Sequence, residues 1–436
     1  MQCPHCNATV DEDTIFCGNC GRQITPLDPG QTVISYATQS DGSSAATEIS
    51  RPSPRYRPSP APQSQRPAQV PDKPRQVDTP PVPPQPSSRP GNIRRIALIG
   101  VLVLIIIAGG TVGLITLLKN NPTSAVVTSH GTGQVTFFDS QNGVGNTGAL
   151  KIQISGLQAP PAGSQYDAWL VNDTNERVIP LGTLVAKSGQ FSLNFAGSVQ
   201  NGQPTNLLGA ANRLEITQEQ GNVTLPTGKP ILAGIFPPLA FVHIKHLLFS
   251  FPTTPHNIGL LVGVLNQTQL LNEQAVLLQA AVANHNTNAI PCIVQSMIDI
   301  IEGTQGAHYQ PLAATCTNQN INAIGDGFGL LGTNAYIQTA SQHASLAATQ
   351  TDSTDNIRLH AGHVEIAMSN LTTWVTTIDQ DALNLLNTPS NAAKVQEIVT
   401  LANQAFNGDS ASGQAGAATA YLQGQMMATL PLVPVS

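Results

Sequence analysis

The sequence predicts a multi-domain chain with a small zinc-ribbon, a disordered linker, a single transmembrane helix, an all-β antiparallel sandwich and an all-α helical bundle. Three observations predict it. Two Cys-x-x-Cys pairs open the chain, an apolar run without charges follows at residues 96–118, and the apolar period changes from two to about 3.6 residues near residue 237. The expected boundaries are residues 1–22, 23–92, 93–119, 130–237 and 238–436.

The first segment is expected to hold a structural zinc ion. Its candidate ligands are Cys3, Cys6, Cys17 and Cys20. A two-residue gap lets both thiolates of a pair turn toward one ion, and two pairs complete a tetrahedral shell with no position left for water. A segment this short has almost no core, so zinc would supply most of its folding free energy. Two disulfides or a redox Cys-x-x-Cys are the alternatives.

The cysteine pattern CPHC…FCGNCG resembles the short zinc-ribbon at the N-terminus of many bacterial membrane proteins. The resemblance covers residues 1–22 and implies the ribbon fold with bound zinc, without implying a particular partner.

Residues 23–92 are rich in Pro, Ser, Gln and Arg, a composition typical of a disordered, partly polyproline tether. The apolar run that follows, as a helix rising about 1.5 Å per residue, is long enough to cross a hydrocarbon core of about 30 Å. A cleaved signal peptide is the alternative, but such segments lie nearer the N-terminus and are shorter. We therefore expect one membrane span.

The charges beside the span predict its orientation. Arg89, Arg94 and Arg95 precede it, whereas after Lys119 the next cation is Lys151. The positive-inside rule then places the N-terminus in the cytoplasm and the C-terminal domains outside. The expected location is the cell membrane, with a single pass.

Residues 130–237 contain short runs in which apolar residues alternate, separated by turn clusters such as DSQNG and VNDTNE. Strands at this spacing are typical of an antiparallel sandwich. The seven runs are VTFF, LKIQI, QYDAWLV, RVIPLGTLV, GQFSLNF, NRLEIT and KPILAGIF.

Within this region, the runs QYDAWLV, PLGTL, GQF and LEITQE…PTGKPILAG resemble the extracytoplasmic domain of anti-sigma-K factors. The resemblance implies a sandwich outside a single membrane helix, in a family whose cytoplasmic half sequesters an extracytoplasmic-function sigma factor. This chain lacks the helical cytoplasmic domain with the H-x-x-x-C-x-x-C motif of zinc-binding members. The matching positions are Tyr166, Trp169, Gly182, Glu215, Glu219, Pro226, Thr227 and Gly228.

Beyond residue 237 the apolar spacing becomes helical. In NIRLHAGHVEIAMSNLTTWV, apolar residues recur every three or four positions and form one stripe. The helical region also resembles histidine-containing bundles fused to such sandwiches in some bacterial membrane proteins. The stripe residues are Ile357, Ala361, Val364, Met368, Leu371 and Val375, and similar patterns cover 239–250, 257–283, 290–302, 330–349, 378–387 and 391–406.

Two His-x-x-His pairs in the helical region are a possible second metal site. Two such helices facing one another could hold a transition metal, and the alternative is that backbone carbonyls or water satisfy the imidazoles. Further histidines lie in the same region, at His256, His285, His308 and His343. The candidate ligands are His243, His246, His360 and His363.

The remaining cysteines, Cys292 and Cys316, would face an oxidising compartment in this topology. A disulfide is expected between them, with two separate buried thiols as the alternative. It would close a loop and stabilise the fold by nominally about 3 kcal/mol.

Composition narrows the function. The net charge is −6, with no basic footprint, so no nucleic-acid partner is expected. No nucleophile with its base is recognisable, and we expect a non-enzymatic envelope protein that senses or binds an extracytoplasmic ligand, with the membrane and a cytoplasmic protein as partners. The alternatives are an anti-sigma factor that regulates an extracytoplasmic-function sigma factor, and a redox or hydrolytic protein that uses the bundle histidines.

Overall fold

The computed structural model describes residues 2, 130–140, 145–197, 199–200, 203–319, 321, 323–389 and 391–435. The predicted ribbon with Cys3, Cys6, Cys17 and Cys20, the linker and the predicted membrane span lie outside the described residues, apart from Gln2. Among the described helices none is both long and apolar enough to cross a membrane, so the predicted transmembrane helix has no counterpart there.

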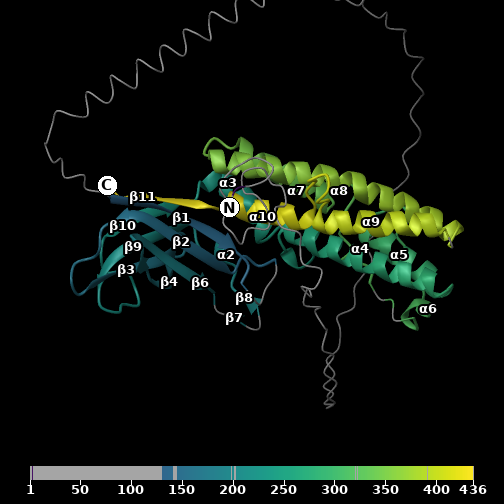
Figure 1. Ribbon diagram of the computed structural model, residues 1–436, viewed down its shortest axis with the longest axis horizontal. Coiled ribbons are helices and arrows are strands. Elements are labelled where there is room, and N and C mark those ends of the chain that lie inside the picture. The colour runs from purple at the N-terminus through teal and green to yellow at the C-terminus, as the bar shows by residue number, and fades with distance from the viewer. Residues whose placement is uncertain are drawn as a thin grey trace, which may run out of the picture. The chain divides into compact units, whose positions relative to one another are not determined.

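The first part of the described chain contributes eight strands to a nine-stranded antiparallel sheet with the order β4-β3-β9-β10-β11-β1-β2-β6-β5 (Figure 1), and β11 comes from residues 430–434. Each of the seven runs with alternating apolar residues supplies a strand, and β7 (Val199–Gln200) and β8 (Gln203–Pro204) pair separately. The strands are β1 (His130–Phe138), β2 (Ala149–Leu157), β3 (Ser164–Asn172), β4 (Arg177–Thr183), β5 (Val185–Lys187), β6 (Gln190–Ala196), β9 (Arg213–Gln220), β10 (Pro230–Ile235) and β11 (Leu430–Pro434).

The predicted two-sheet sandwich is wrong, because β11 joins what would otherwise be two four-stranded groups. On one side Val135 of β1 pairs with Leu430, and on the other Ala233 of β10 pairs with Val433. The resulting sheet is continuous and nearly closed, since β4 at one edge also contacts β6 near the other. Apolar alternation is the same in one curved sheet and in two facing sheets, so periodicity could not distinguish them. Strand β11 also corrects the expectation that residues 238–436 are wholly helical.

The second part of the described chain is helical, as the change of period indicated (Figure 1). The stripe from Ile357 to Val375 is buried along one long helix, which also includes the predicted helix at 378–387. The helices are α2 (Leu207–Ala210), α3 (Pro238–Leu248), η1 (Pro255–Asn257), α4 (Leu260–Ala283), α5 (Ala289–Glu302), α6 (Ala314–Thr317), α7 (Tyr336–Thr349), α8 (Asp355–Asn387), α9 (Ala392–Asn407) and α10 (Ala417–Met427).

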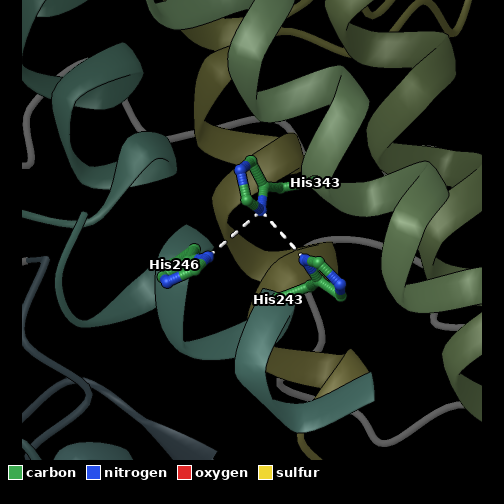
Figure 2. Close-up of side chains that lie close together, drawn as sticks. All are labelled: His243, His246 and His343. Atoms are coloured by element: carbon green, nitrogen blue, oxygen red, sulfur yellow. Dashed lines mark hydrogen bonds between the residues drawn. The ribbon is translucent and has the colours of Figure 1, made fainter. Parts of the chain in front are cut away.

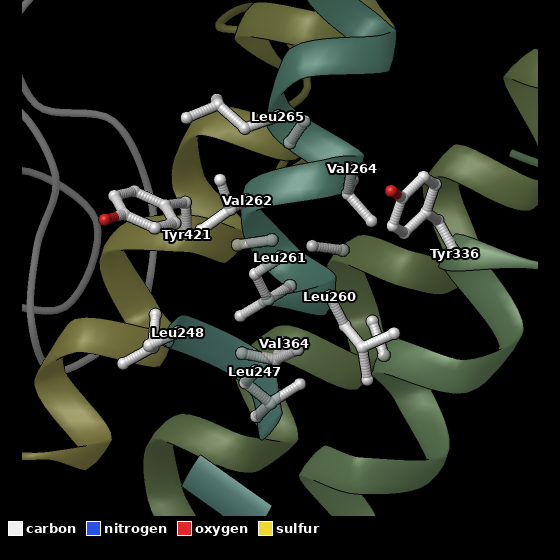
Figure 3. Close-up of a cluster of buried hydrophobic side chains, with 14 of the residues drawn as sticks. Leu247, Leu248, Leu260, Leu261, Val262, Val264, Leu265, Tyr336, Val364 and Tyr421 are labelled. Atoms are coloured by element: carbon white, nitrogen blue, oxygen red, sulfur yellow. The ribbon is translucent and has the colours of Figure 1, made fainter. Parts of the chain in front are cut away.

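Helix α4 runs through the helical core, where Leu260, Leu261 and Val264 are buried (Figure 3). Its first two turns are buried, and the helix packs against α3, α5, α7, α9 and α10. Gly263 allows α4 and α7 to approach closely, because a Cβ at that position would overlap the ring of Tyr336 on α7. The core side chains labelled in Figure 3 are Leu247, Leu248, Leu260, Leu261, Val262, Val264, Leu265, Tyr336, Val364 and Tyr421.

A single carboxylate ties α10 to the sheet. Asp139, just after β1, accepts hydrogen bonds from the backbone N–H groups of Gly145 (2.7 Å) and Thr147 (2.8 Å). It also accepts from the Tyr421 hydroxyl (2.7 Å) and from Nε2 of Gln425 (2.9 Å). Because α10 leads directly into β11, this junction helps to fix the strand that completes the sheet.

Candidate metal centre

Three histidine side chains converge between α3 and α7 (Figure 2). Nδ1 of His343 lies 3.1 Å from Nδ1 of His243 and 3.3 Å from Nδ1 of His246. One nitrogen from each ring lies within 4.8 Å of the other two. Among the residues that the structure describes, no other group of three or more His, Cys, Asp or Glu side chains is placed to hold a metal ion.

Local structure explains why these rings meet. Histidines three positions apart lie on one face of α3. The carboxylate of Asp352, shortly after α7 ends, accepts hydrogen bonds from the backbone N–H groups of Leu239 (2.7 Å) and Ala240 (3.0 Å) in the first turn of α3. A carboxylate there also interacts favourably with the helix dipole. The start of α3 is thus held beside the end of α7, which brings His343 across from the α3 pair.

Hydrogen bonding alone leaves this cluster incomplete. A neutral imidazole Nδ1 carries either one hydrogen or one lone pair. Nδ1 of His343 therefore cannot make a full hydrogen bond to both His243 and His246, although both Nδ1 atoms are within reach. A cation between the rings would use all three lone pairs at once.

The spacing also fits a metal. Two nitrogens bound to one tetrahedral zinc at about 2.0–2.1 Å lie about 3.3–3.4 Å apart. The two Nδ1 distances to His343, 3.1 and 3.3 Å, are close to that value. The third pair is looser, with one ring nitrogen of His243 within 4.8 Å of one of His246.

The surroundings keep the three imidazoles neutral. Burial lowers the pKa of His243 and also that of His246, with smaller contributions to the latter from the charges of His243 and Lys245. Burial, followed by the charges of His246 and His243, lowers the pKa of His343 to about 4. Only the neutral imidazole binds a metal, so the cluster is ready to bind at neutral pH.

Two neighbours orient the rings. The ring of Phe251 packs edge-on against His246 and His343, with centroids 5.4 and 5.0 Å away. The amide of Gln350 lies 3.2 Å from Nε2 of His243. The nitrogen and oxygen of an amide exchange places on rotation, and with its oxygen toward the ring Gln350 would accept the Nε2–H and leave Nδ1 of His243 free for a metal.

The second His-x-x-His pair does not join the first. Both rings lie on α8 and contact Oε1 of Gln423 on α10, which is 2.6 Å from Nδ1 of His360 and 2.9 Å from Nδ1 of His363. Gln423 is fully buried, and its Nε2 has no hydrogen-bond partner among the described residues. Because the Gln423 amide oxygen can accept an N–H from each ring, hydrogen bonds satisfy both imidazoles and no metal is needed.

The cysteines of the helical region, Cys292 on α5 and Cys316 on α6, are joined by a disulfide. Both residues are buried, and the bridge holds the segment after α5 against that helix. The predicted zinc cysteines near the N-terminus lie outside the described residues, so their arrangement stays a prediction.

Several residues that carry the resemblance to anti-sigma-K factors form one hydrogen-bonded unit. Nε1 of Trp169 donates to Oγ1 of Thr217 (2.8 Å), which donates in turn to the carboxylate of Glu219 (2.6 Å). Glu219 also accepts from the backbone N–H of Thr227 (3.0 Å) and of Gly228 (3.1 Å). These contacts hold the loop between β9 and β10, so this part of the pattern has a structural role.

Sequence reasoning missed His343 as a ligand. It is a lone histidine in its helix, without a His-x-x-His partner to mark it. The available signal was its position three residues after Ala340 and four before Ala347, which at helical spacing places it on the same side of the helix as these two apolar residues. Comparison with known proteins adds nothing here, because no family model, curated protein or solved structure matches the chain.

Proposed function

We propose that the described region binds one divalent transition metal ion through His243, His246 and His343. The observation that carries this proposal is the convergence of three imidazoles, with two Nδ1 distances to His343 at the spacing of metal ligands and a hydrogen-bond arrangement that cannot satisfy all three rings. The sequence predicts that this region binds something, and the proposal names a metal ion as what it binds.

The ligand set selects the class of metal. Imidazole nitrogen suits zinc, copper, nickel and iron, whereas calcium and magnesium require oxygen ligands. No carboxylate belongs to the cluster among the described residues. Zinc is therefore the appropriate probe.

The disulfide between Cys292 and Cys316 supports the proposal that this region lies in an oxidising compartment, outside the cytoplasm. Disulfides persist in secreted and envelope proteins and are rare in the cytosol. Thiol labelling of the denatured chain, isolated without reductant, tests this: Cys292 and Cys316 should react only after reduction, and reactive thiols before reduction would contradict it.

Zinc binding tests the proposed function directly. The full-length chain with Cys3, Cys6, Cys17 and Cys20 replaced by Ser, which removes the other predicted zinc ligands, should bind one zinc per chain in equilibrium dialysis. Loss of a residue that only contacts a ligand costs roughly 10–100-fold in affinity. His343→Ala, which removes a ligand, should therefore cost at least about 100-fold.

The matched control is His363→Ala, which removes a histidine of the other pair from α8. It should retain the zinc affinity of the parent. A folded parent that binds no zinc, or a His343→Ala variant that binds zinc as tightly as the parent, would refute the proposal.

A further inference from the structure

We infer that the metal ion at His243, His246 and His343 keeps an open coordination position that takes a small oxyanion, such as a carboxylate or phosphate group. This inference rests on the proposed function, because it concerns the ligand of the same metal. Three features of the site carry it: the number of protein ligands, access from solvent, and the local charge.

The protein supplies too few ligands to close the metal shell. Structural zinc sites have four protein ligands, whereas sites with three protein ligands keep the fourth position for water or another small molecule. Among the described residues no fourth His, Cys, Asp or Glu joins the cluster. The amide of Gln350 contacts the Nε2 side of His243, away from the converging Nδ1 atoms.

Solvent can reach the site. All three histidines are half-buried, neither enclosed in the core nor fully exposed. Phe251 packs against the rings of His246 and His343 and restricts the approach from its own side. A small molecule can therefore approach a metal held there, whereas a large one would meet the Phe251 ring.

The charge of the loaded site favours an anion. Three neutral imidazoles leave the charge of a divalent ion uncompensated. Lys245, the residue before His246 on α3, adds a further positive charge. No carboxylate among the described residues joins the cluster, and that of Asp352 instead accepts the backbone N–H groups of Leu239 and Ala240. An oxyanion would supply both the missing ligand and the missing negative charge.

Cobalt(II) makes the open position visible, because its visible absorption depends on coordination. The probe is the full-length chain with the four N-terminal cysteines replaced by Ser and loaded with cobalt. Azide, acetate and inorganic phosphate are titrated separately. We expect a saturable change of the cobalt spectrum with azide, which reports the open position, and also with acetate or phosphate. A response to azide alone would overturn the assignment of an oxyanion ligand.

A charge variant sharpens the test. Lys245→Gln should weaken azide binding about fivefold, because one nearby positive charge is lost, and should affect cobalt binding less. Lys187→Gln, an exposed lysine of β5, is the matched control and should leave the azide titration unchanged.

The outcomes separate the two proposals. Bound cobalt whose spectrum responds to none of the three anions would show a closed shell, which overturns this inference and leaves the proposed function intact. Failure of the folded chain to bind cobalt or zinc would overturn both. Equal azide affinity in the parent and in Lys245→Gln would overturn the role assigned to local charge.

Discussion

Helices α3 and α8 carry the same His-x-x-His spacing but give their histidines different partners. On α3, His243 and His246 face a third imidazole, His343, and cannot all be satisfied by hydrogen bonds to one another. On α8, His360 and His363 share the amide oxygen of a buried glutamine. The spacing alone places two rings on one face of a helix, and the residue supplied by the facing helix decides whether a ligand set results.

Converting the α8 pair into the α3 arrangement is the strongest test of this comparison. Gln423→His would place a lone pair where an amide oxygen now lies 2.6 and 2.9 Å from the two Nδ1 atoms. We expect the number of zinc ions bound by the chain without N-terminal cysteines to rise from one to two, measured as zinc content after dialysis.

Gln423→Leu is the matched control for this gain. It has no ligand atom, so zinc content should stay at one, and the unpaired imidazole N–H groups should destabilise the fold by about 1–3 kcal/mol. A folded Gln423→His variant that still binds one zinc would show that a third imidazole is not sufficient.

A smaller effect is expected at Gln350, which contacts the far side of the His243 ring. Gln350→Ala should weaken zinc binding roughly tenfold, because residues that orient a ligand contribute about 10–100-fold to affinity. Gln342→Ala, an exposed glutamine of the same α7 segment, should leave the affinity unchanged in the same competition titration. Equal losses from the two variants would mean that Gln350 does not orient the ring.

The smallest effect is on the pH dependence of stability without metal. His343 has a pKa of about 4 in the folded chain and 6.5 as an ordinary histidine, so between these values the unfolded chain binds more protons. The free energy of unfolding should therefore rise with pH through this window. His343→Leu should flatten the rise in urea unfolding, and Gln342→Leu should not. A slope that His343→Leu leaves unchanged would contradict the assignment.

Local pattern predicted much of the fold. Alternating residues such as Ile152 and Ile154 mark a strand whose buried face is visible in the sequence, and the stripe along α8 marks a helix in the same way. Strand β11 was not predicted because LPLVP is short and contains two prolines, which weaken a strand pattern. Its place in the sheet depends on pairing with β1 and β10, which are far away in the sequence.

The candidate site was predicted only in part, because a sequence pattern shows local spacing and does not show contacts between distant segments. The spacing of His243 and His246 is local, and so the pair could be recognised. The third histidine and the glutamine that occupies the other pair come from α7 and α10, and only the packing of helices brings them into place. A single sequence carries no direct record of such pairings.

The position of β11 has a consequence for synthesis. A ribosome delivers this central strand only after all of the helical region, and at about 5–20 residues per second the interval after β10 is on the order of 10–40 s. Until then the facing edges of β1 and β10 lack the strand that finally separates them. Open edges of this kind invite pairing with other chains, so the nascent protein should be most prone to aggregation before β11 has been made.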